Sequence, residues 1–490
     1  MSDRRQTLIV SDLHLGGGAA DPGDDHVYQD RQLERFVRQR LASPAGQAGD
    51  IELFFNGDFL EFAQVRPQAY RSPSADYWCS EAESLEKLEA ILAGHDNSFA
   101  ALHDFQAAGN RVTLAAGNHD VDLYWPAVRK RLRARIGPGL RFATGVDWVE
   151  RHDGRLHIGH GHLEDPANRF KHWSAPILRA PDGARLEMCP GTLFMVRFVN
   201  GLEARYPFAD NLHPVQNLAT ILLREDAGGF ASAGWMLLKF IARHAKTLGS
   251  SEAADVGRRL LARLREDDAF AQRLAAASRL LGDDRSCASV RRDVSDEEQL
   301  ADLMQRLFAV LPADEWLALF ALRPAPVLGA GGSKTLGTII GARHFGREAL
   351  RDLAQRRFDA CPAAQVIVMG HTHLPDTRSF DKRHYLNPGS WTRYLDLEKH
   401  PPLRLDDLRD EARFPYELNY VVVEADADGT PLVARLECFE RREPEGEMGL
   451  VCYRPFSALA CLYGLTLPVA IPVRHAGLRG AGGAAPPRPT

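Results

Sequence analysis

The chain opens its first predicted strand with Leu8-Ile9-Val10-Ser11-Asp12-Leu13-His14. The apolar first half predicts a buried β-strand, and the polar turn that follows carries a carboxylate and an imidazole two residues apart. In an extended turn, residues i and i+2 point to the same side, so Asp12 and His14 could bind one cation together. An Asp-x-His triplet occurs by chance in many proteins, so this interpretation depends on how the other strands end.

Two further buried strands end in polar turns of the same kind. The run 51–55 is followed by Asn56-Gly57-Asp58, and the run 112–116 by Gly117-Asn118-His119-Asp120. Strands alternating with helical patterns predict an α/β fold with right-handed crossovers and a largely parallel inner sheet, in which neighbouring carboxyl ends lie side by side. Ordinary turn chemistry explains any one of these turns, but it is a poor explanation for all three.

Two more predicted strands end in pairs of histidines. A predicted hairpin ends in His160-Gly161-His162, and the run 365–369 ends in Gly370-His371-Thr372-His373. His157 falls inside the hairpin strand, so we interpret it as a packed histidine. We prefer His160 to His162 as a metal ligand, because the glycine after His160 lets the backbone approach a metal closely. His162 would then contact substrate or the periphery of the metal site.

Together, the strand ends supply nitrogen and oxygen ligands and no thiolate. The candidate ligands are Asp12, His14, Asp58, Asn118, His160, His371 and His373. Such donors suit borderline divalent ions, and we expect Mn first, with Fe, Zn, Co and Ni as alternatives. Seven ligands are too many for one tetrahedral ion, but they suit two ions that share a bridging carboxylate, as in two-metal hydrolases.

In this order, Asp-x-His, Gly-Asp, Gly-Asn-His-Asp, His-Gly-His and Gly-His-Thr-His resemble the sequence blocks of the calcineurin-like metallophosphoesterases. The resemblance covers about the first 165 residues and a return from about 360 to 440. It implies a four-layer α/β/β/α sandwich core and a dinuclear metal-dependent hydrolase of a phosphate ester or pyrophosphate. A hydroxide between the metals would attack phosphorus in line. The family acts on monoesters, diesters and pyrophosphates, so the blocks leave the substrate and its binding residues open.

Carried over residue by residue, the resemblance implies two metal positions that share Asp58. One ion would be held by Asp12, His14, Asp58 and His373, and the other by Asp58, Asn118, His160 and His371. His119 would lie beside the leaving-group oxygen as general acid or transition-state stabiliser. Asp120 would fix the tautomer of His119 and raise its basicity. The alternative for Asp120 is a helix N-cap before Tyr124.

Two other functions are weighed against this one. The UDP-2,3-diacylglucosamine pyrophosphatase branch shares Asp-x-His, Gly-Asp and the Asn-x-Gly-Ser-Trp turn found here at 387–391. That branch has arginine where His119 stands, and its insertion is far smaller. A non-catalytic interaction module on the same sandwich is the alternative from another class, as in the retromer subunit that resembles this family. Its blocks are degraded, whereas every block is complete here.

We expect four segments along the chain. They are a first core part at 1–164, a large, mostly helical insertion at 165–342, a second core part at 343–440 and a C-terminal extension at 441–490, whose end from 477 is expected to be disordered. The insertion would be a lid over the metal site or a docked helical domain without substrate contact.

Several apolar or basic features of these segments have more than one interpretation. The stretches 192–202 and 235–243 suit an interfacial helix, a pocket for an acyl chain or the buried face of a bundle. The run 456–473 is too short for a membrane span and contains two prolines, so it would pack on the core or make a weak membrane-surface contact. Three basic residues could neutralise a substrate phosphate: Arg197, Arg205 and Lys239.

The composition excludes some classes of partner. Lys and Arg number 60 against 65 Asp and Glu, and no long basic tract offers a footprint for nucleic acid. The 7 cysteines include no Cys-x-x-Cys pair, which predicts a reducing compartment. Met1-Ser2-Asp3-Arg4-Arg5 leads almost directly into a strand and leaves no room for a signal peptide. We therefore expect a cytoplasmic enzyme with a small-molecule substrate; the oligomeric state stays open.

Overall fold

The computed structural model describes most of the two predicted core parts and pieces of the predicted insertion. The described residues are 6–18, 27–65, 79–180, 183–196, 200–203, 206–209, 211–213, 261–279, 286–296, 299–300, 303, 346–396, 404–425 and 432–442. All of them belong to the first of two units, Met1–Gly449, the second being Leu450–Thr490. Several expectations lie outside the described residues, namely those on Arg197, Arg205, Lys239, 235–243, 456–473 and 477–490.

The first sheet carries three of the predicted ligand turns. Its six strands run in the order β15-β14-β1-β2-β3-β4. Their bounds are β1 Gln6–Val10, β2 Ile51–Asn56, β3 Arg111–Ala115, β4 Arg141–Ala143, β14 Tyr416–Glu424 and β15 Val433–Arg442. The strands β1 to β4 are parallel, whereas β14 and β15 are antiparallel to their neighbours. The carboxyl ends of β1, β2 and β3 therefore meet at one edge, as the sequence predicts.

The second sheet carries the histidine pairs. Its five strands run in the order β11-β12-β10-β6-β5. Their bounds are β5 Val149–Arg151, β6 Leu156–Ile158, β10 Val366–Val368, β11 Asp376–Phe380 and β12 Arg383–Asn387. The strands β5 and β6 form the predicted antiparallel hairpin, and β6 is parallel to β10. Two small sheets pair β7 (Ile177–Ala180) with β8 (Gly183–Leu186) and β9 (Leu212–His213) with β13 (Leu395–Asp396).

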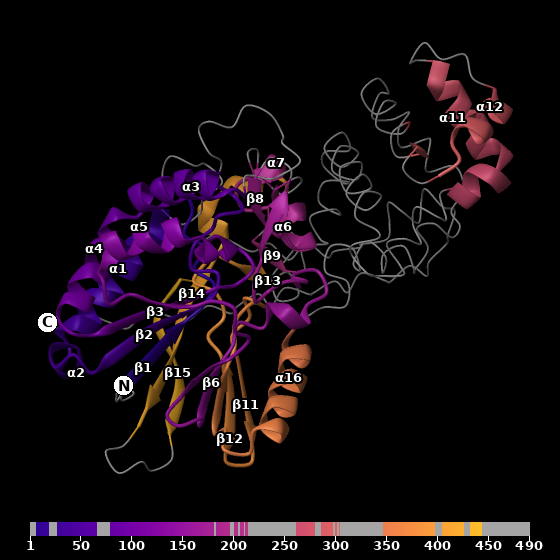
Figure 1. Cartoon of the computed structure of the whole chain (residues 1–490). Coiled ribbons are helices and arrows are strands. Elements are labelled where there is room, and N and C mark those ends of the chain that lie inside the picture. The colour runs from indigo at the N-terminus through magenta and orange to yellow at the C-terminus, as the bar shows by residue number, and fades with distance from the viewer. Residues whose placement is uncertain are drawn as a thin grey trace, which may run out of the picture. The chain divides into compact units, whose positions relative to one another are not determined.

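The helices connect the strands and cover the sheets. Those of the core parts are α1 Val27–Ala42, α2 Pro44–Gln47, α3 Glu81–Gly94, α4 Asp96–Ala107, α5 Pro126–Ile136 and α16 Arg347–Ala360. Figure 1 shows α1, α3, α4 and α5 grouped beside β1, β2 and β3, and α16 beside β11 and β12. Within the predicted insertion lie α6 Pro190–Phe194, α7 Asn200–Glu203, α11 Asp268–Ser278 and α12 Cys287–Asp293. No described helix is long and apolar enough to cross a membrane.

Alternate residues of one strand enter different apolar cores, because successive side chains of a strand point to opposite faces. Leu8 and Val10 of β1 pack with residues of α1, α3, α4 and α5, whereas Ile9 packs with residues of the second sheet. On β10, Val368 joins this shared core and Ile367 packs against α16. The fold is therefore mixed α/β, with apolar cores on both faces of each large sheet.

Candidate metal centre

The backbone is strained at most of the predicted ligands. Five of them have left-handed φ angles, namely Asp12 (55°), His14 (50°), Asp58 (50°), His371 (71°) and His373 (58°). Only three other non-glycine residues of the described chain share this conformation. It costs an ordinary residue roughly 1–2 kcal/mol, and such strain persists where the surrounding structure fixes the conformation, often at functional sites. All five residues lie in the turns that directly follow β1, β2 and β10.

This strain leads to a stability prediction at His373. We expect His373→Gly to be about 1 kcal/mol more stable than His373→Ala, because the left-handed cost of a Cβ exceeds the extra chain entropy of glycine. Urea unfolding of the full chain in EDTA measures the difference without any contribution from bound metal. The control position is His384, which lies within β12 and does not have a positive φ. There we expect the alanine variant to be more stable than the glycine variant. Equal stabilities of the two variants at position 373 would contradict the predicted strain.

Two glycines let the ligand turns pack against one another. A Cβ on Gly117 would lie 2.2 Å from Asp58 Oδ1, and a Cβ on Gly370 would lie 1.9 Å from Ser11 Oγ and 2.6 Å from Asp12 Oδ2. Neither position can hold a larger residue without displacing a ligand turn. Steric crowding therefore explains why the first residue of Gly-Asn-His-Asp and of Gly-His-Thr-His is glycine in this structure.

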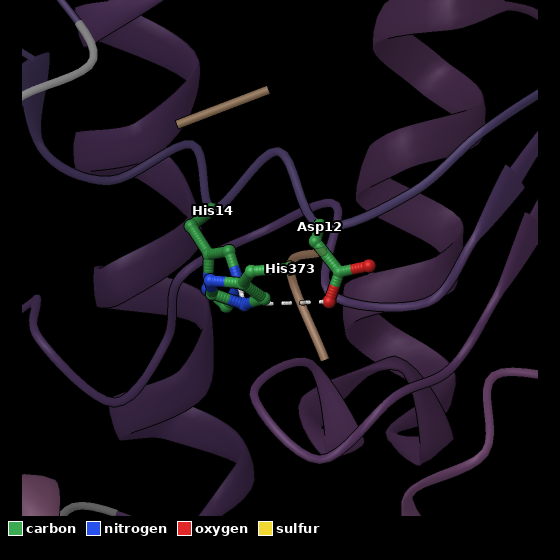
Figure 2. Close-up of side chains that lie close together, drawn as sticks. All are labelled: Asp12, His14 and His373. Carbon is green, nitrogen blue, oxygen red and sulfur yellow. Dashed lines mark hydrogen bonds and ion pairs between the residues drawn. The ribbon is translucent and has the colours of Figure 1, made fainter. Parts of the chain in front are cut away.

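The first cluster consists of Asp12, His14 and His373. Figure 2 shows the two imidazole rings and the Asp12 carboxylate converging. The Nε2 atoms of His14 and His373 are 3.1 Å apart, and His373 Nε2 is 3.4 Å from Asp12 Oδ1. Ligand atoms at about 2.1 Å from a tetrahedral ion lie about 3.4 Å from one another. The spacing of these three atoms thus suits ligands of a single ion.

The second cluster consists of Asp58, His160 and His371, with one possible ligand atom of each within 4.8 Å of the others. His160 Nδ1 donates to the carbonyl of Asn56 at 2.7 Å, which leaves the lone pair of this imidazole to Nε2, 3.0 Å from Asp58 Oδ2. Asn118 is 2% exposed, and its Oδ1 has no hydrogen-bond partner among the described residues. A buried amide oxygen in this position fits a metal ligand.

Among the three histidines of the hairpin region, the structure brings only His160 into a cluster. His157 is buried in β6, where its Nε2 bonds to Gly154 O at 2.9 Å and its Nδ1 accepts from Arg357 Nε at 2.9 Å. His162 is buried against the ring of Trp173, with 4.4 Å between the ring centroids. Neither of its ring nitrogens has a hydrogen-bond partner among the described residues.

The carboxylate that contacts the His119 ring is Glu61 and not Asp120, so Asp120 does not fix the tautomer as predicted, although its charge does help to raise the pKa of His119. Glu61 Oε2 is 2.6 Å from His119 Nδ1 and 2.7 Å from His14 Nδ1. The Asp120 carboxylate instead accepts from the backbone N–H groups of Phe59 and Gly117, at 3.0 and 2.6 Å. These two bonds tie the turns after β2 and β3 together. Asp120 directly precedes the 3₁₀ helix Val121–Tyr124, but its side chain makes no cap hydrogen bond to that helix.

Electrostatics makes Glu61 and His119 a charged pair. Burial alone would raise the pKa of Glu61, but the neighbouring His119 and His14 outweigh it and lower that pKa to about 2. Burial alone would lower the pKa of His119, but Glu61 and Asp58 outweigh it and raise that pKa to about 10. His119 therefore holds a proton that it could donate.

Glu61 leads to a second prediction. We expect Glu61→Gln to lower turnover by about 10- to 100-fold and to weaken the binding of the ion proposed at His14 by a similar factor, because Glu61 contacts both His119 and His14. Steady-state hydrolysis and metal analysis of the same preparation measure the two effects. The surface variant Glu89→Gln, which breaks an exposed pair with Arg131, is the control. Unchanged turnover in Glu61→Gln would show that this carboxylate does not act through His119.

The turn at 387–391 holds the ligand loops of the two sheets together. Ser390 Oγ and Trp391 N both donate to the carbonyl of Asp12, at 2.9 and 3.0 Å, and Asn387 Nδ2 donates to Gly370 O at 3.0 Å. Sequence reasoning identified this turn but missed Glu61, although its place three residues after Asp58 was a usable signal. It also missed Asp165 and Asn168, whose contacts reach the second cluster.

Comparison with known proteins adds little to this geometry. No family model matches the chain, and no curated protein matches it. Among solved structures, Vps29 from Entamoeba histolytica in complex with zinc is 22% identical over 20% of this chain and 48% of that chain, with a TM-score of 0.10. A double mutant of the same protein is 18% identical over 20% and 50% of the two chains, with a TM-score of 0.11. The match thus spans about half of those structures, and such low TM-scores carry no argument about family or activity.

Proposed function

We propose that this protein is a dinuclear metal-dependent phosphoesterase of the calcineurin-like type. The observation that carries the proposal is the position of Asp58 between the two clusters. Its Oδ2 atom is 3.0 Å from His160 Nε2 and 4.0 Å from His14 Nε2. Asp58 thus stands where two neighbouring ions would share a carboxylate. The left-handed backbone at five ligands and the orphaned Asn118 oxygen support the same interpretation.

The fold that we propose for this enzyme is the four-layer α/β/β/α sandwich, with 165–342 as an insertion. The core shared by both sheets and the helical cores on their outer faces support it. The start of the insertion contacts the site, which favours a lid. Thr192 Oγ1 donates to Asn118 O at 3.2 Å, and Asn200 Nδ2 donates to Ala63 O at 3.0 Å.

In the proposed mechanism, the chain supplies ligands, orientation and a proton. Asp12, His14, Asp58 and His373 would hold one ion, and Asp58, Asn118, His160 and His371 the other. Two bound divalent ions would polarise the phosphoryl oxygens and supply hydroxide near neutral pH. The ring of His119 packs edge-on against His14, with 4.6 Å between centroids, and the Glu61 carboxylate faces its Nδ1 at 2.6 Å. His119 Nε2 is then the atom that donates a proton to the leaving oxygen.

Metal analysis and hydrolysis assays on the full chain test this function. We expect two bound Mn²⁺ ions and Mn²⁺-dependent hydrolysis of p-nitrophenyl phosphate, bis-p-nitrophenyl phosphate or both. A panel of nucleotides and lipid pyrophosphates would then define the substrate class, and it includes the UDP-2,3-diacylglucosamine alternative. A protein that binds both ions but is inert on every substrate would favour the non-catalytic interaction module.

A further inference from the structure

Asp165 lies against the outer side of His371. Its Oδ2 is 3.0 Å from His371 Nε2, and among the described residues it is not a member of the second cluster. A carboxylate can only accept a hydrogen bond, so the Nε2 atom of His371 must carry the proton. The lone pair of this imidazole then belongs to Nδ1, so Nδ1 is the nitrogen with which His371 would bind a metal.

The same carboxylate orients a chain of two amides. Asn168 Nδ2 donates to Asp165 Oδ2 at 2.8 Å, which turns the Asn168 oxygen away from Asp165. That oxygen accepts from Asn118 Nδ2 at 3.3 Å. The Asn118 oxygen must therefore point the other way, and it is the buried atom that has no partner among the described residues. Each amide has one possible orientation because the chain begins at an acceptor-only group.

We propose that Asp165 and Asn168 are positioning residues, which fix His371 and Asn118 as ligands of the second metal. This inference rests on the proposed function, because it concerns the same two-metal site. A single turn at the start of the predicted insertion would thus orient two ligands. Asn118 follows β3 of the first large sheet, and His371 follows β10 of the second.

The turn is itself rigidly built. Ala167 N donates to Asp165 Oδ1 at 2.9 Å, and Asn168 N donates to Asp165 O at 3.0 Å. Gly191 N donates to Ala167 O at 2.7 Å, so the turn is tied to the start of α6. A Cβ on Gly191 would lie 2.1 Å from Asn168 Oδ1, which shows how closely this backbone packs on the asparagine. A turn held in this way can keep both ligand orientations without a bound ion.

Mn²⁺ titration of the full chain by calorimetry tests the inference. For Asp165→Asn and for Asn168→Ala, we expect one of two Mn²⁺ sites to weaken by about 10- to 100-fold while the other keeps its affinity. Asp165→Asn should have the larger effect, because it disturbs both ligands, whereas Asn168→Ala disturbs only Asn118. Glu164→Gln is the matched control, since this neighbouring carboxylate is 47% exposed and pairs only loosely with Arg356, at 3.5 Å.

A double mutant separates positioning from a general structural role. If Asp165 acts through both His371 and Asn118, adding Asp165→Asn to His371→Ala should weaken the second site only by about as much as Asn168→Ala does alone, because the share that acts through His371 is already lost. The electron paramagnetic resonance spectrum gives an independent readout: at a Mn²⁺ concentration that just fills both wild-type sites, the coupling between neighbouring ions should be lost in both single variants, because their weakened site stays mostly empty. A purely structural role would lower the melting temperature in EDTA and leave this coupling intact.

The outcomes distinguish this inference from the proposed function. Two Mn²⁺ sites in the wild type with unchanged affinities in both variants would overturn the role of Asp165 and Asn168 alone. Fewer than two sites in the wild type would overturn the dinuclear function, and the inference with it. If Asp165→Asn does not fold, Asn168→Ala still decides, because it leaves the Asp165–His371 contact in place.

Discussion

Asp58→Asn is expected to abolish phosphoester hydrolysis and to prevent the stable binding of both metal ions. Asparagine tolerates the left-handed backbone of this position, where φ is 50°, so the substitution removes the charge and preserves the turn. The neutral amide cannot bridge two cations as a carboxylate can. Asp58 Oδ1 also accepts a hydrogen bond from His119 N at 2.9 Å. The side-chain oxygen of asparagine at this position can still accept it.

The expected loss of activity is on the order of a thousandfold or more. Metal ions contribute several kcal/mol of charge stabilisation in the transition state, and each factor of ten in rate corresponds to about 1.4 kcal/mol. Metal analysis after desalting, together with Mn²⁺-dependent hydrolysis, measures both effects. The control is Asp50→Asn, which changes a carboxylate just before the amino end of the same strand, β2. If Asp58→Asn kept two ions and activity, Asp58 would not be the shared ligand.

The sequence predicted the strand ends of this site well, because they depend on local chemistry. A buried apolar run followed by Asp, Asn, Gly or His indicates a strand and its turn, and parallel topology then brings several such turns to one edge. The structure places Asp12, His14 and His373 in one cluster and Asp58, His160 and His371 in another, and it also groups His119 with His14 and Asp58. Their separation in the sequence does not matter once the two sheets share a core.

The residues that contact the proposed ligands from outside were harder to predict. Glu61 and Asp120 are both carboxylates near histidines in the sequence, and only the packing of the β2 and β3 turns shows which one contacts His119. Asp165 and His371 are 206 residues apart, and no periodic pattern connects them. Such contacts follow from tertiary packing, which propensity and motif spacing do not contain.

His119→Ala is expected to retain both metal ions and to lower turnover of an alkyl phosphate ester by about 10²- to 10⁴-fold, the usual contribution of a positioned acid or base. His119 belongs to neither predicted ligand set, so its removal leaves those ligands in place. Metal analysis should therefore give the wild-type value, in contrast to Asp58→Asn. The control is His172→Ala, which removes an imidazole outside the site. The His172 side chain is 56% exposed and pairs with Glu187.

The leaving group decides whether His119 acts as an acid or only stabilises charge. A general acid matters most when the departing oxygen is strongly basic, because such an oxygen leaves poorly without a proton. The defect of His119→Ala should then be small for a p-nitrophenyl ester, whose leaving group is acidic, and large for an alkyl phosphate ester. Glu61→Gln should follow the same trend with a smaller amplitude, because Glu61 acts through His119. A defect of equal size for both substrates would assign His119 to charge stabilisation and remove the proton transfer from the mechanism.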